Sequence, residues 1–179
     1  MKPFELTATG TVLVSFTALE AGLINDLAVQ VVELLGGNTA QPQDRMFATI
    51  GIGGGDAPSS DPAIARLLPD AYRDDRDASQ EFRRLTEHSL SDRKIANARE
   101  LVRMLGAGGG AGSDEIELDA DAQQAWLRAL NDIRLIIASR IGIEGDGDEG
   151  RGDSDADLII RDVYDWLGMV QGSLVEVLE

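Results

Sequence analysis

The sequence predicts a mainly α-helical fold, a bundle of about five helices with a small β-hairpin at its N-terminal end. The strongest indication is the segment from Trp126 to Ile143, where apolar side chains recur at steps of three and four. That spacing forms one stripe along an α-helix. Further apolar residues widen the stripe, so we expect a central helix that is packed on several sides. Its stripe residues are Trp126, Leu130, Ile133, Ile137 and Ile141.

The N-terminal segment predicts the hairpin and a first helix. Residues 4–16 alternate and are rich in β-branched side chains, with a turn signal at Thr9-Gly10. Thr17 and Glu20 then have the spacing of a capping box, so a helix is expected to run from there to about Leu35. The residues expected on its buried face are Leu19, Leu23, Leu27, Val31 and Leu34.

The middle of the chain predicts more helix and one further strand. Asp61-Pro62 has the order of an N-cap and a first helical residue, for a short helix over 63–68. An apolar stripe between 77 and 105 predicts either one long helix or two, because Ser89 could cap a second one. Residues 115–118 alternate and could add a third strand to the hairpin.

Two helices have the widest apolar faces, the central one and the last one. Asp119 is in position to cap the central helix, and the last helix is expected from about Asp157 to Leu178. We expect these two helices to pack against each other through their tryptophans and leucines.

The length of 179 residues is that of one domain, so we predict a single helical domain over 1–179. Three segments rich in glycine or acidic residues are expected to be flexible. These segments are 38–60, 106–113 and 144–155.

Composition excludes several classes of function. The chain has 16 basic and 32 acidic residues, a net charge of −16, which repels nucleic-acid phosphates and anionic membranes. We therefore predict no nucleic-acid partner and no membrane partner. The absence of cysteine excludes disulfides, thiolate metal sites and cysteine nucleophiles. No signal-peptide pattern or long apolar run is present, so a cytoplasmic protein is expected.

The short motifs do not predict a catalytic residue, a cofactor or a metal site. The glycine runs at 51–55 and 106–111 lack the strand-then-helix context of a nucleotide-binding turn. His88 is the single histidine, which excludes two-histidine metal sites and disfavours a serine triad. Basic residues between Arg83 and Arg103 alternate with acidic ones, and we interpret them as a salt-bridged helix surface.

One set of polar residues is a candidate ligand site. A turn around residue 72 is dense in charge, and the central helix has polar residues within its apolar surroundings. If the two meet, they form either a structural hydrogen-bond network or a pocket for a polar ligand. The residues predicted for this site are Tyr72, Arg73, Asp74, Asn131, Asp132 and Arg134.

Four strings of the sequence together carry a family resemblance: residues 67–75, 81–87, 126–135 and 163–167. They resemble an actinobacterial family of unknown function, the domain-of-unknown-function family numbered two thousand and seventeen. The resemblance extends over essentially the whole chain and implies no activity, cofactor or catalytic residue. Genes of the family commonly lie beside that of the adaptor that delivers N-degron substrates to the Clp protease, which implies a link to proteolysis.

These observations favour a non-enzymatic regulatory or protein-interaction domain, with the Clp adaptor system as one implied partner and homo-oligomer formation left open. The alternative is a small-polar-ligand binder or an enzyme that uses the carboxylate and arginine cluster. A transcriptional regulator is the third hypothesis, which the acidity disfavours.

Overall fold

The computed structural model describes residues 2–36, 61–69, 76–108, 115–145, 147–148, 150–151 and 154–179. Within these ranges the chain forms five helices and a small sheet, which confirms the predicted mainly α-helical class. The elements are β1 (Lys2–Leu6), β2 (Val12–Ser15), α1 (Ala18–Gly36), α3 (Pro62–Leu67), α4 (Arg76–Gly108), β3 (Glu115–Leu118), α5 (Ala120–Arg140) and α6 (Asp155–Leu178).

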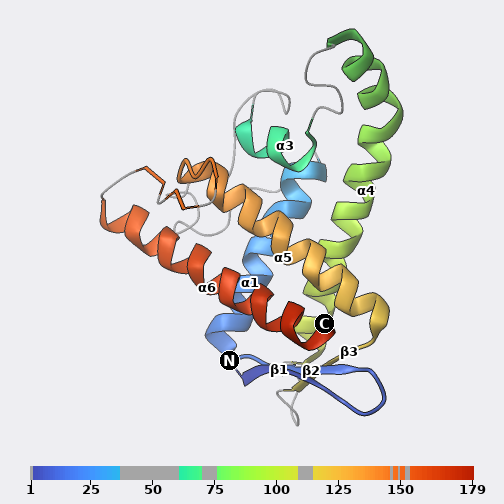
Figure 1. The fold of residues 1–179 in the computed structure, drawn as a ribbon, viewed down its shortest axis with the longest axis vertical. Helices are drawn as coiled ribbons and strands as arrows, with labels where there is room; N and C mark the ends of the chain where they lie inside the picture. Colours follow the sequence, from blue (N-terminus) through green and yellow to red (C-terminus); the bar gives the residue numbers. More distant parts are fainter. Residues whose placement is uncertain are drawn as a thin grey trace.

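Helix α5 is the centre of the molecule. Figure 1 shows it between α4 and α6, with α3 near its C-terminal end and the sheet below its N-terminal end. It contacts α1, α3, α4, α6 and β3. All five residues of the predicted stripe are buried, and Trp126 and Leu130 have no exposed surface. The prediction of a central helix packed on several sides is therefore confirmed.

The tryptophan of α5 joins this helix to the sheet end of the molecule. Its ring stacks on Phe16, with centroids 6.1 Å apart, and meets the ring of Phe4 edge-on at 6.4 Å. Helices α5 and α6 also pack together, as predicted. Trp166 of α6 is half-buried and packs against the core.

The sheet has the order β1-β2-β3, with both neighbouring pairs antiparallel. The turn between β1 and β2 contains Gly10 at φ +84°, a conformation that glycine adopts at little cost. The third strand joins the hairpin as predicted, with Val14 opposite Ile116. The buried amide of Gln123 donates to the carbonyls of Gly10 and Leu118, each at 3.0 Å, so α5 holds the hairpin turn and β3 together.

Three of the predicted helix caps are present. The Thr17 amide donates to the Glu20 carboxylate at 2.8 Å, and the Glu20 amide donates back to the Thr17 hydroxyl. Asp61 caps α3 and Asp119 caps α5, each accepting from a backbone amide at 2.8 Å. Helix α6 begins at Asp155, two residues before the predicted start, because Ser154 forms its own capping box there.

The buried face of α1 differs from the prediction. Leu19 is 84% exposed, whereas Ile24 and Ala28 are buried together with Leu27 and Val31. Both sets have helical spacing, so periodicity alone could not choose between two overlapping stripes. The choice depends on where α1 meets α4, which is a tertiary contact.

Residues 76–108 form one long helix, which answers the question of one helix or two. Ser89 lies inside α4 rather than at a helix start. The first residues of the predicted glycine linker, 106–108, continue the same helix. The rest of that linker, like 38–60, lies outside the described residues, and the flexibility of the three segments stays a prediction.

Hydrogen bonds and one ion pair tie α3 and the turn after α5 together. Arg140 pairs with Asp61 at 2.6 Å, and Arg66 donates to the Ile143 carbonyl. The Arg151 amide donates to the Ile141 carbonyl at 2.6 Å. Among the described residues, none of the helices combines the length and the apolar character needed to cross a membrane.

Candidate functional site

A cleft of about 390 Å³ lies between α4 and α5 and opens to solvent. Its size is near the lower end of the range for small-molecule sites. Its lining combines cationic side chains, amides, a carboxylate and two leucines. The lining residues are Leu90, Arg93, Lys94 and Asn97 from α4, and Leu127, Arg128, Asn131 and Asp132 from α5.

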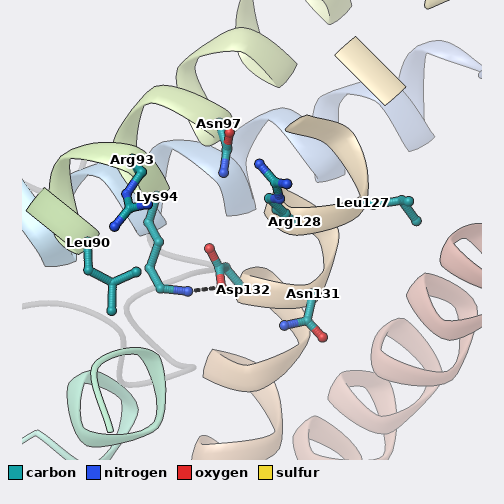
Figure 2. Close-up of a pocket in the computed structure, with 8 residues that line it drawn as sticks. All are labelled: Leu90, Arg93, Lys94, Asn97, Leu127, Arg128, Asn131 and Asp132. Carbon is teal, nitrogen blue, oxygen red and sulfur yellow. Dashed lines mark hydrogen bonds and ion pairs between the residues drawn. The ribbon is translucent and has the colours of Figure 1, made fainter. Parts of the chain in front are cut away.

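The spacing along each helix explains why these side chains share one cleft. The α4 positions are separated by three, one and three residues, and the α5 positions by one, three and one. Residues three or four apart lie on the same face of a helix. Two polar faces therefore meet across the α4–α5 contact. Figure 2 shows the side chains of Arg93, Asn97 and Arg128 around those of Lys94 and Asp132.

The inner pair is Lys94 and Asp132. The Lys94 ammonium lies 2.5 Å from Oδ1 of Asp132, and the two side chains are 16% and 3% exposed. Burial raises the pKa of the Asp132 carboxyl, and this outweighs the lowering by the hydrogen bond and charge of Lys94. Oδ2 of Asp132 is buried and has no hydrogen-bond partner in the part of the chain that the structure describes. The pair is therefore incompletely satisfied, which is costly at a buried position.

The two arginines of the cleft are exposed and lie outside this pair. Arg93 donates its Nε to the Ser89 carbonyl at 3.2 Å, on its own helix. Arg128 and Asp132 are four residues apart, but the carboxylate pairs with Lys94. Within the described part of the chain, neither guanidinium forms an ion pair.

The predicted site residues do not all come together. Asn131 and Asp132 line the cleft, and Tyr72, Arg73 and Asp74 lie outside the described residues. Arg134 faces α6: its Nη1 donates to Gln171 at 2.8 Å, and its guanidinium lies 4.7 Å from the centre of the Tyr164 ring. Two residues along a helix turn the side chain by about 200°, which separates Asp132 from Arg134.

The α4 side of the cleft was not predicted as a site. Arg93 and Lys94 belong to the basic run that we interpreted as a salt-bridged surface. That interpretation holds for Arg103, which pairs with Glu100 of the same helix at 2.5 Å. The sequence does contain a pattern that indicates the α4 side of the cleft. Leu90, Lys94 and Asn97 are spaced by four and three residues, which places them on one half-buried face of a helix.

No group of three or more metal-ligating side chains occurs among the residues that the structure describes. This finding does not cover the acidic residues Asp70, Asp74, Asp75, Glu81 and Glu87, whose side chains lie outside the described part of the chain. The predicted absence of a metal site therefore stays a prediction.

The model of the family described as "Domain of unknown function (DUF2017)" matches residues 1–178, so the chain belongs to this family. The predicted resemblance is confirmed. The chain is also similar to proteins of Mycobacterium tuberculosis and Mycobacterium bovis that are named "Oxidative stress regulator AosR". Each is 32% identical over 174 residues, which cover 89% of this chain and 78% of the relative. No solved structure matches the chain.

Proposed function

We propose that this chain is a regulatory protein that acts by binding a protein partner and not by catalysis. The observation that carries the proposal is the similarity to the two mycobacterial regulators over 89% of the chain. The lining of the cleft supports binding over catalysis, because its one carboxylate, Asp132, has no second carboxylate, histidine or hydroxyl in the lining to share acid–base chemistry with.

A response to oxidants in this chain would need chemistry other than that of a thiol. The sequence contains no cysteine, so neither a sulfenic acid nor a disulfide can form within it. We propose that the signal reaches this chain through the molecule it binds. A link to the Clp adaptor, which family gene order implies, is one form of this proposal.

Complementation in a Mycobacterium bovis strain that lacks its own relative tests the regulatory proposal. We expect this chain to restore survival under peroxide at least partly, with the native relative as the positive control. Capture of the tagged chain from the rescued cells, with and without the Clp adaptor, then identifies the partner. Full rescue by the relative and none by an equally expressed copy of this chain would contradict the proposal.

A second function, the binding of a small polar ligand, is favoured by the α4–α5 cleft. Thermal unfolding in the presence of a panel of polar metabolites tests it, because a ligand that binds the folded state raises the Tm. Asp132→Ala is the matched variant. A lower Tm for this variant, combined with no ligand that raises the wild-type Tm, would leave the cleft with a structural role.

A further inference from the structure

The α4–α5 cleft has the opposite charge from the chain as a whole. Arg93, Lys94 and Arg128 face one carboxylate, Asp132, so the lining has an excess of two positive charges. The whole chain has a net charge of −16. A local reversal of this kind is expected where a site accepts an anion, because nearby cations determine the potential felt at contact.

The geometry offers the two arginines for this purpose. Lys94 is committed to Asp132, whereas Arg93 and Arg128 are exposed at the cleft and form no ion pair within the described ranges. They come from different helices and lie on either side of the inner pair in Figure 2. Guanidinium groups present parallel N–H donors that match the oxygens of a phosphate or carboxylate.

A second observation concerns the inner end of the cleft. The Asp132 side chain is only 3% exposed, and its Oδ2 has no hydrogen-bond donor among the described residues. Buried polar atoms nearly always have a partner in proteins. Oδ2 has almost no accessible surface, so a ligand reaches it only when the side chains around it shift. A hydroxyl or amine donor brought there would then complete its hydrogen bonding.

We propose that the cleft binds a small anion, a phosphate or carboxylate group on a molecule that also has a hydroxyl or amine donor. Arg93 and Arg128 hold the anionic group, and Asp132 accepts a hydrogen bond from the donor. The proposal rests on the second function proposed above and names its ligand class. The regulatory proposal does not depend on it.

A small anion fits better than an acidic macromolecule. At physiological salt, charges are screened beyond about 8 Å, so the two arginines dominate for a ligand confined to the cleft. A long polyanion would extend beyond this range over a surface that is strongly acidic overall. The excess of two positive charges matches a single phosphate or dicarboxylate.

Titration of the full chain, followed by amide NMR shifts at constant ionic strength, tests the proposal. The probes are inorganic phosphate, glycerol phosphate and malate, with sodium chloride as the reference. We expect saturable shifts at positions 93–97 and 128–132, with Kd values on the order of 1 mM. Glycerol phosphate, which adds hydroxyl donors, should bind more tightly than inorganic phosphate. If glycerol phosphate binds more tightly than malate, the preferred anionic group is a phosphate. If malate binds more tightly, it is a carboxylate.

Three variants locate the site. Arg93→Gln and Arg128→Gln should each weaken binding about 10-fold, the loss expected for a charged hydrogen bond. Arg103→Gln is the matched control, because Arg103 is an exposed arginine of the same helix that lies outside the cleft lining. It should bind like the wild type.

Two results would overturn the proposal: shifts that do not saturate and equal those in chloride, or an equal loss of binding in Arg103→Gln. Failure here is distinct from failure of the other functions. A neutral ligand that raises the Tm would support small-ligand binding in the cleft while contradicting its preference for an anion. Rescue of the mycobacterial strain tests the regulatory function independently.

Discussion

At the scale of single residues, we expect substitutions in the buried pair of Lys94 and Asp132 to change the free energy of unfolding most. Replacing Lys94 with methionine leaves a carboxylate that is 3% exposed without its partner. We expect Lys94→Met to lower the free energy of unfolding by about 3 kcal/mol at neutral pH, the scale of breaking a buried pair from one side. Lys94→Met combined with Asp132→Leu should recover most of this loss, because neither side then has a buried charge.

The stability loss of Lys94→Met should depend on pH, and it should decrease as the pH falls. Burial already raises the pKa of Asp132 in the wild type, and loss of Lys94 removes the hydrogen bond and charge that lower it. The penalty in Lys94→Met is therefore full at neutral pH and falls as pH decreases through that raised pKa. Urea unfolding of both proteins between pH 7 and 4 measures this. A stability difference that is independent of pH would show that Asp132 does not cause the penalty.

A second residue-scale prediction concerns Gly150, in the turn after α5. It has φ +77°, and a Cβ atom there would lie 2.6 Å from the Ile141 carbonyl oxygen. Gly147 has φ +78° but open space around it. Gly147→Ala should therefore cost roughly 1 kcal/mol for its left-handed backbone alone.

Gly150→Ala should cost about twice as much, because the clash adds to the backbone strain. Gly145→Ala, at a position with open space and no positive φ, is the neutral control. Thermal unfolding of the three variants gives the comparison. Equal losses at 147 and 150 would mean that the turn relaxes away from Ile141.

At the scale of elements, the pair of Asp61 and Arg140 joins the start of α3 to the end of α5. Partial burial alone would raise the pKa of Asp61. The hydrogen bonds from the Arg140 guanidinium and the Ala63 amide outweigh it and hold the pKa below its usual 3.8. A lowered pKa contributes stability that is present above about 3.8 and is lost as pH falls through the folded value.

Two substitutions separate the charge from the cap. Asparagine also caps helices, so Asp61→Asn removes the ion pair but retains the N-cap, whereas Asp61→Ala removes both. We expect Asp61→Ala to cost about 1 kcal/mol more than Asp61→Asn. The stability gap between the wild type and Asp61→Asn should shrink between pH 5 and pH 2. A gap that stays constant over this range would exclude the ion pair as its source.

At the scale of the whole molecule, local patterns predicted the elements well and the site partially. The hairpin, the third strand, the caps and the buried stripe of α5 follow from spacing and turn chemistry within short windows. The cleft does not, because it depends on which face of α4 meets α5. Asp132 and Arg134 are close in sequence, yet the helix rotation between them sends one to Lys94 and the other to Tyr164. The partner of a polar residue on a helix is therefore determined by tertiary packing and cannot be predicted from sequence spacing alone.

The net charge of −16 gives a prediction for the molecule as a whole. Self-repulsion of a strongly acidic chain destabilises its compact state, and salt screens it. We expect the Tm to rise by about 3 °C between about 10 mM and about 300 mM NaCl, which corresponds to roughly 1 kcal/mol for a chain of this size. Differential scanning fluorimetry in a buffer without phosphate measures the change.

Charge variants provide the controls for this salt effect. Asp162 and Asp165 are exposed on α6, so Asp162→Asn with Asp165→Asn removes two negative charges and should flatten the salt dependence. Arg93→Gln with Arg128→Gln makes the net charge more negative by two and should steepen the salt dependence of the Tm. A Tm that falls with added NaCl would show that ion pairs such as Asp61–Arg140 contribute more to stability than the overall repulsion costs.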